Sequence, residues 1–396
     1  RVAILWCEPP KHCQSMAHSS VDPAFAGNGF SNFGNIYEVD IDAEEELDEV
    51  LPLTGCSTVA VAALLTATVG SLEEHLARAA VQDTIDASCF PNELLAIWCV
   101  REDRAHGPHV DAGLIAVPMP PDAAASIGNS GRHVTEDARG PAVWLISQLT
   151  EHMGLPSRAF AQAVTMLDIY CARMHGAIGI EALPGTCVAI CSLIHKTEVP
   201  SEPVDGRLLQ SAATWWSKCL ETSGRDAVPI ALKQLRDYEE SILKTFQWQI
   251  NFPNVESWML AFCGRLDAAS GGVFRRSLTW VMHQGVVLAK VILQRVSVME
   301  LRSHRFACAL CVLGLVAARL LPLSALRPDR EIGIVEWERL YLQTGWVKEL
   351  PTCVLPEQSQ DGFGKLMEIV MNSRLSALRR DALLLATITQ RVFTQG

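Results

Sequence analysis

Apolar residues recur at helical spacing along the chain from about residue 138 onwards. In one stretch they follow each other at steps of four, three and four, which places them on one face of an α-helix: Phe160, Val164, Leu167 and Cys171. Ser157 precedes this stripe and is predicted to cap the helix, because its hydroxyl can accept a hydrogen bond from the first turn. Similar patterns predict helices that begin at Pro141, at a Thr186 cap, over Ser211–Leu220 and over Pro229–Phe246.

A second helical series begins at Val255, after a short stretch rich in Asn and Pro. Two of its segments, Trp280–Val296 and Leu301–Leu321, are apolar nearly all round and are therefore predicted to be central, buried helices. Strand patterns are scarce in this part of the chain. We therefore predict an all-α body made of two packed helical domains, residues 135–252 and 253–396.

Residues 1–130 follow a different pattern. The first 37 residues mix Gly, Ser, Asn and Pro without periodicity and are predicted to be irregular. Glu38–Glu49 holds eight acidic side chains and no basic one, as expected of a solvated or disordered segment, or of an electrostatic docking tail. The apolar runs within residues 51–116 indicate either a small subdomain or a segment that packs on the main body. A linker-like stretch rich in Pro, Gly and Ser follows.

The charge of the chain is concentrated in its first third. Residues 1–130 contain 5 Lys and Arg against 19 Asp and Glu, a net charge of −14, whereas the remainder has 28 against 25, a net charge of +3. Because no basic face is evident, we do not expect nucleic acid as a partner. With 49% hydrophobic and 19% charged residues, the 396-residue chain is not disordered throughout.

The 13 cysteines are not arranged as a disulfide scaffold. Several lie in apolar runs such as Phe306–Val312, where a free cysteine behaves as a small hydrophobe. The start of the chain has no secretory signal pattern, and the apolar stretches Ser57–Leu72 and Phe306–Ala318 are shorter than the roughly 20 residues that span a bilayer. The expected setting is therefore intracellular and reducing, in the nucleus or the cytoplasm, without a membrane partner.

Candidate catalytic and metal-binding groups are few. The segment His106–Asp111 has an H-x-x-H-x-D pattern, but a metal site would need a further ligand, and a surface loop is the simpler interpretation. Cys308 and Cys311 lie in an apolar run, which favours core packing over a redox pair, and His283 is expected to be a core histidine. No nucleophile–base set or phosphate-binding fingerprint is present. We therefore expect no enzymatic activity, cofactor or metal.

One carboxylate falls on an apolar helix face. The inward row of the predicted helix 229–246 contains Leu232, Leu235, Glu239, Ile242 and Phe246. A carboxylate in such a row is costly unless it is paired and hydrogen-bonded, so Glu239 requires a partner elsewhere in the fold. Lys196 is the only basic residue of the third predicted helix apart from His195.

The stretch from Arg139 to Pro253 resembles the first cyclin box in the spacing of four residues. Cyclins carry an Arg before the first helix and an Asp in the second, 29 residues later, and Arg139 and Asp168 stand 29 residues apart. Lys196 corresponds to a cyclin Lys near a helix end. Glu239 corresponds to a cyclin Glu near the start of a helix motif that ends in Pro, which Tyr238–Pro253 resembles.

The resemblance implies two consecutive cyclin-box five-helix bundles, preceded by an acidic, partly irregular N-terminal region. It implies that Lys196 and Glu239 pair and help to hold the surface that binds the C-helix of a cyclin-dependent protein kinase. Arg139 and Asp168 would form a structural ion pair between the first two helices. The implied function is activation of that kinase in cell-cycle control, with kinase substrates as further partners. An adaptor or scaffold on the same fold and a transcription-associated cyclin are the alternatives.

The chain departs from the cyclin pattern at several positions. Ala138, Leu145 and Pro184 replace residues of the cyclin substrate-docking patch, so docking of Arg-x-Leu substrates is not expected. Gly185 replaces a Leu and is predicted to weaken packing at the start of the third helix. An insertion that includes Ser211–Ser217 separates Lys196 from Glu239, and no clear amphipathic helix precedes the first box.

Overall fold

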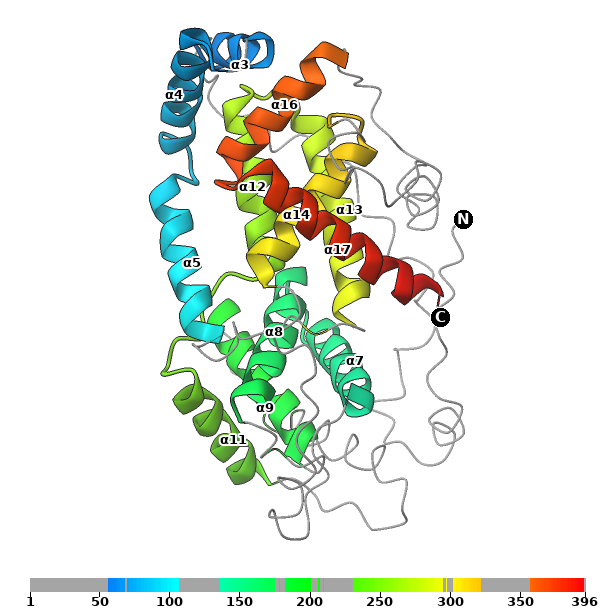
Figure 1. The fold of residues 1–396 in the computed structure, drawn as a ribbon. Helices are drawn as coiled ribbons and strands as arrows, with labels where there is room; N and C mark the ends of the chain where they lie inside the picture. Colours follow the sequence, from blue (N-terminus) through cyan, green and yellow to red (C-terminus); the bar gives the residue numbers. More distant parts are fainter. Residues whose placement is uncertain are drawn as a thin grey trace, which may run out of the picture. The chain divides into compact units, whose positions relative to one another are not determined.

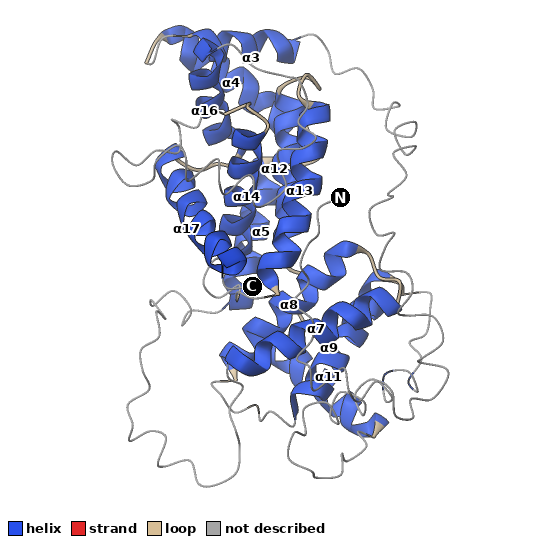
Figure 2. Cartoon of the chain, turned by 90° about the vertical axis from the view of Figure 1, so that its right-hand side faces the viewer, coloured by secondary structure: helices blue, strands red, loops and turns tan. Residues whose placement is uncertain are grey.

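The computed structural model describes residues 56–67, 70–106, 136–174, 182–200, 231–294, 302–321 and 357–394, together with positions 178, 206, 209 and 297 (Figure 1). Within these residues every regular element is an α-helix and no strand occurs (Figure 2), which confirms the predicted all-α class for this part of the chain. The segments predicted over residues 1–49, 117–131 and 211–220 lie outside it.

A first group of helices falls within the first predicted domain. Its members are α7 (Glu136–His152), α8 (Ser157–Arg173), α9 (Leu183–Glu198) and α11 (Leu232–Thr245). The centre of this group is α9, which contacts the other three helices and is buried along residues 183–195. Helix α11 is amphipathic: Leu235 and Ile242 face the core, whereas the opposite side is exposed.

A second group of helices falls within the second predicted domain. It consists of α12 (Val255–Ala269), α13 (Arg275–Leu293), α14 (Ser303–Ala317), α16 (Glu357–Val370) and α17 (Leu375–Thr394). As its apolar sequence predicts, α14 is buried along Phe306–Ala317 and contacts α12, α13 and α17. The predicted start of this series at Val255 is confirmed, and the Asn254 side chain caps α12 by accepting a hydrogen bond from the Ser257 amide, 3.0 Å away.

Helix α13 is not the fully buried helix that its sequence predicted. Its exposed residues include Arg276, Thr279, His283 and Val287, which recur at steps of three and four and form one solvent-facing stripe. The expectation that His283 is a core histidine is therefore wrong. Polar residues at helical spacing within an apolar segment are sufficient to turn one face of the helix outward.

Three helices precede the first group in sequence but pack on the second: α3 (Cys56–Thr66), α4 (Leu72–Asp86) and α5 (Asn92–His106). Helix α5 does so through Trp98, whose ring contacts Trp258, and Glu102, which contacts His304. Helix α3 contacts α4 and α16, and α4 contacts α12 and α16. Helices α3 and α16 cross so closely that a methyl group on Gly362 of α16 would overlap the backbone of Leu65 of α3. Of the two alternatives for this region, the structure therefore shows helices packed on the main body.

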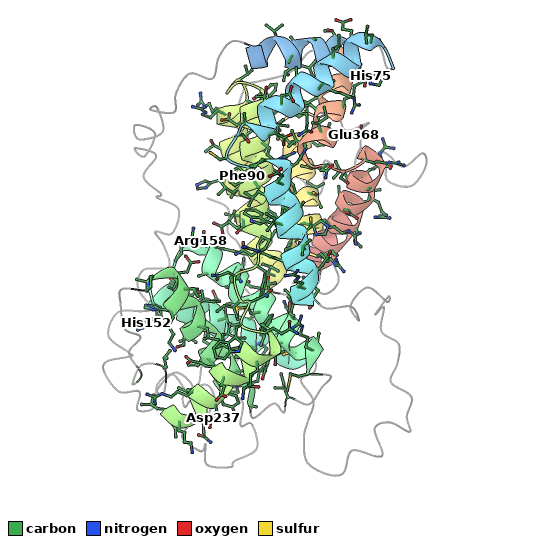
Figure 3. All side chains as sticks on the ribbon, turned by 90° about the vertical axis from the view of Figure 1, so that its left-hand side faces the viewer. His75, Phe90, His152, Arg158, Asp237 and Glu368 are labelled. Atoms are coloured by element: carbon green, nitrogen blue, oxygen red, sulfur yellow. The ribbon has the colours of Figure 1, made fainter. Side chains whose placement is uncertain are left out.

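A buried arginine fastens the turn between α4 and α5 to the second group. Arg265 of α12 is fully buried and donates hydrogen bonds to the carbonyl of Phe90 and the side chain of Asn92, each at 2.7 Å. It also donates to the carbonyls of Val370 and Ile369, at 2.7 and 3.3 Å. Phe90 is labelled at this position, beside α12, in Figure 3. Burial lowers the pKa of Arg265 to about 10, and the charge of Asp86 acts in the opposite direction.

The helix starts differ from the predicted caps. Helix α8 begins at Ser157 with Pro156 as its N-cap, and the Ser157 hydroxyl instead donates to Glu256, 2.7 Å away. Helix α9 begins before Thr186, whose hydroxyl donates to the Ala182 carbonyl of its own first turn. Helix α7 begins at Glu136, so Pro141 lies inside it and leaves one backbone hydrogen bond unmade.

Candidate functional site

Helices α9 and α11 bring Lys196 and Glu239 together. The ammonium nitrogen of Lys196 lies 2.7 Å from each carboxylate oxygen of Glu239, 43 residues further along the chain. The Lys196 side chain is 49% exposed and the Glu239 side chain 16% exposed. The carboxylate thus lies at the edge of the core and the ammonium at the surface, which lets the pair contact a partner without opening the fold.

Ser192 completes this arrangement from one turn earlier on α9. Its hydroxyl donates a hydrogen bond of 2.6 Å to Oε1 of Glu239, the oxygen that Lys196 also binds. Residues four apart on a helix lie on the same face, so Ser192 and Lys196 approach the carboxylate together. Ser192 is 1% exposed, so among Ser192, Lys196 and Glu239 its hydroxyl is the group that is shielded from solvent.

The close approach of α9 and α11 depends on Gly185. A side-chain carbon on Gly185 would lie 2.7 Å from Cδ2 of Tyr238 and nearer still to Cε2. The prediction that Gly185 weakens the start of α9 is therefore wrong, because the Tyr238 ring of α11 fills the space that a side chain would occupy. Leu183 and Pro184 beside it are buried as well.

Arg139 and Asp168 are also in contact. Two nitrogens of the Arg139 guanidinium bind the two carboxylate oxygens of Asp168, at 2.7 and 2.9 Å. One of these nitrogens also donates to the carbonyl of Leu293 at the end of α13, 2.9 Å away. The side chains of Arg139 and Asp168 are only 12% and 4% exposed. This buried, two-pronged pair joins α7 to α8 and ties both to α13.

No protein-family model matches the chain, and no curated protein does. The resemblance to cyclins therefore depends on the spacing of four residues and on the geometry that they adopt. The roles that the resemblance implies for Lys196, Glu239, Arg139 and Asp168 stay predictions.

Two of the residues that replace the cyclin substrate-docking patch are buried. Leu145 and Pro184 are both buried, so neither contributes an exposed apolar side chain to that region. The side chain of Ala138 lies outside the described residues. Trp144, next to Leu145 on α7, is 37% exposed.

The other candidate residues do not form a site within the part of the chain that the structure describes. His106 is a buried residue at the end of α5 rather than part of a surface loop, and His109 and Asp111 lie outside the described residues. Burial raises the pKa of Cys308 well above its ordinary value, and Cys311, which interacts with Cys263, is shifted in the same direction. Thiols with raised pKa values are poor nucleophiles, which agrees with core packing.

The described residues form neither a metal-ligand cluster nor a membrane-spanning helix. Among those residues, no group of three or more His, Cys, Asp or Glu side chains is arranged to hold a metal ion. No helix in the same part of the chain combines the length and apolar character that crossing a membrane requires.

Sequence reasoning overlooked three parts of this site. Ser192 gave no signal of its own, although its position four residues before Lys196 places it on the same helix face. The Leu293 carbonyl and the Tyr238 ring could not be found from spacing, because both contacts depend on how the helices pack.

Proposed function

We propose that this chain is a cyclin-type regulatory subunit that binds and activates a cyclin-dependent protein kinase. The observation that carries the proposal is the Lys196–Glu239 pair. Its two residues match the cyclin pattern in sequence, they are hydrogen-bonded to each other, and the lysine is half exposed. The Arg139–Asp168 pair supports the same assignment, since residues spaced as in cyclins form the contact that the resemblance implies.

The proposed mechanism is selection of the active kinase conformation. A kinase is active when its C-helix places a glutamate against the catalytic lysine. A rigid helical surface that binds the C-helix only in this position shifts the kinase toward the active state by its differential affinity. In this proposal ATP and Mg²⁺ belong to the kinase, and this chain contributes a fixed surface around Lys196 and Glu239.

Helix α5 extends the surface proposed for the kinase. No amphipathic helix was evident before the first predicted box, yet α5 precedes it and is tied to it: Arg173 of α8 donates to the carbonyls of Arg104 and Thr245. In cyclins, by resemblance, a helix before the first box also touches the kinase. Ile97 and Val100 on α5, 50% and 48% exposed, are therefore assigned to this surface.

A cyclin-fold adaptor that does not activate a kinase is the second candidate. Leu145 and Pro184 are buried where cyclins, by resemblance, dock kinase substrates. The loss of this docking patch favours the adaptor, because an adaptor does not need to present substrates to a kinase. A transcription-associated cyclin is a third candidate, and the nucleus or the cytoplasm is the proposed setting. The adaptor and the activator differ in one measurable property, namely whether the bound kinase gains activity.

Capture from co-expression tests the proposed binding. The whole chain would be co-expressed with each member of a panel of cyclin-dependent kinases and purified by a tag. We expect one or more kinases to co-purify with the wild type and to be lost with Lys196→Ala/Glu239→Ala. The matched control is Glu240→Ala/Lys244→Ala, which removes an exposed ion pair of the same type from α11 and should retain the kinase. Absence of every kinase from the wild-type sample would contradict the proposal.

A further inference from the structure

We infer that Ser192 is the positioning residue of the Lys196–Glu239 pair: its buried hydroxyl fixes the Glu239 carboxylate, which in turn fixes the Lys196 ammonium. The bond lengths carry this inference, because the Ser192 hydroxyl and the Lys196 ammonium meet on the same oxygen of Glu239 at 2.6 and 2.7 Å. The effect of Ser192 on kinase binding rests on the proposed function. Its effect on the geometry of the Lys196–Glu239 pair does not, because that pair exists in the free protein.

The two donors to Glu239 differ in how firmly they are held. Lys196 has a long side chain that is 49% exposed, and fixing such a side chain costs conformational entropy. An exposed lysine alone would therefore hold a carboxylate weakly. Ser192 is 1% exposed, and a single torsion sets the position of its hydroxyl oxygen, so this oxygen is already in place when the carboxylate arrives. The serine is thus the fixed member of the cluster.

The direction of the serine hydrogen bond gives the carboxylate its orientation. A hydroxyl within a helix often donates to the carbonyl four residues earlier, as Thr186 does on the same helix. The Ser192 hydroxyl has one hydrogen, and it donates this hydrogen to Glu239 instead. With Oε1 held in this way, Lys196 can contact both oxygens at 2.7 Å. This double contact leaves one ammonium hydrogen for an acceptor on a partner.

The inference can be tested on the free protein by the reactivity of Lys196. Acetic anhydride reacts with a lysine nitrogen that it can reach, so a nitrogen held in hydrogen bonds to both oxygens of a carboxylate reacts slowly. The rate at Lys196 would be measured by mass spectrometry relative to Lys233, which is exposed on α11. We expect Ser192→Ala to raise the Lys196 rate about three- to tenfold, since a hydrogen bond to a charged group is lost.

The matched control removes a hydroxyl from the same pair of helices without touching Glu239. Ser241 on α11 hydrogen-bonds Tyr170 of α8, so Ser241→Ala should leave the relative rate at Lys196 unchanged. Ser192→Thr keeps the hydroxyl and should keep the slow rate. Ser192→Cys has nearly the size of serine but a weak donor, and should react as fast as Ser192→Ala. It also provides a second folded variant if the alanine variant is unstable.

The outcomes separate this inference from the proposed function. An unchanged acylation rate at Lys196 in Ser192→Ala and Ser192→Cys would overturn the inference about Ser192. An equal rise in rate at every lysine would also overturn it, because it would indicate that the whole fold has loosened. If the wild type captures no kinase, the proposed function fails while the labelling result still decides the role of Ser192. If a kinase is captured, Ser192→Ala should weaken binding about tenfold in the wild type but add nothing in the Lys196→Ala background.

Discussion

Gly185 of α9 lies directly beneath the ring of Tyr238 of α11, in a space too small for any side-chain carbon. A methyl group at Gly185 would overlap Cε2 of the ring and approach Cδ2 to 2.7 Å. The two helices can pack closely at this point only because one of them has no side chain. The same two helices carry Ser192, Lys196 and Glu239, so the geometry of the candidate site depends on this contact.

Gly185→Ala should therefore destabilise the protein by about 1–3 kcal/mol in urea unfolding, the usual cost of overpacking a core. Alanine favours a helix over glycine by roughly 1 kcal/mol, so the sign of the result separates crowding from helix propensity. Gly140→Ala is the comparison at an exposed position of α7, where the added methyl group meets nothing within 4 Å beyond its chain neighbours. Because Pro141 follows it, the gain in helix propensity there should be smaller than at an ordinary helix position. Equal stabilisation by both substitutions would contradict the close contact with Tyr238.

Arg139→Ala should cost about 3–5 kcal/mol of stability, because it removes the two hydrogen bonds that the guanidinium donates to the buried carboxylate of Asp168. Arg158→Ala removes an arginine from a more exposed pair with Glu198 and should cost less than about 1 kcal/mol. Thermal unfolding followed by circular dichroism measures both. Similar losses in the two variants would show that burial of the Arg139 pair contributes little.

Arg265→Met should loosen the attachment of the α4–α5 turn to the second helix group. The substitution leaves the carbonyls of Phe90 and Val370 without their donor, at a cost of about 3 kcal/mol or more. Hydrogen exchange should increase around these acceptors, in the α4–α5 turn with the adjoining start of α5 and at the end of α16, while α9 and α11 keep their protection. An increase in hydrogen exchange that is the same throughout the chain would contradict a local role for Arg265.

Acidification should destabilise the protein in part through His106. Burial lowers the pKa of His106 below its ordinary value near 6.5, although its Nδ1 contacts the Glu102 carbonyl at 2.9 Å. The unfolded chain then binds a proton at a higher pH than the folded chain, so stability is lost as the pH falls below about 6.5. His106→Phe should reduce the loss between pH 7 and pH 5 by up to about 2 kcal/mol. An identical pH dependence in both proteins would contradict the prediction.

The helical class and the approximate positions of most helices follow from apolar periodicity, which is a local property of the sequence. The need for a partner at Glu239 was also predictable, because a carboxylate on an apolar face is costly. Helix starts were less predictable: the hydroxyls of Ser157 and Thr186, both expected as caps, donate elsewhere. Local sequence does not determine which of several available acceptors a hydroxyl contacts.

Contacts between distant segments account for what the sequence could not predict. The placement of α3, α4 and α5 on the second helix group depends on Arg265 and on the close crossing at Gly362, which no periodicity indicates. Gly185 leaves no gap at the start of α9, because the Tyr238 ring of α11 fills the space, and helix spacing does not indicate this contact. Ser192 was overlooked for the same reason, because its role exists only across two packed helices.

The most direct test of the central claim is the activity of the captured kinase toward histone. The kinase would be assayed at equal concentration alone, with the wild-type chain, with Lys196→Ala/Glu239→Ala and with Glu240→Ala/Lys244→Ala, after circular dichroism has shown that each variant is folded. We expect strong activation by the wild type and the control variant and little by the Lys196→Ala/Glu239→Ala variant. A kinase that binds the wild type without gaining activity, or that the folded Lys196→Ala/Glu239→Ala variant activates equally, would contradict the account.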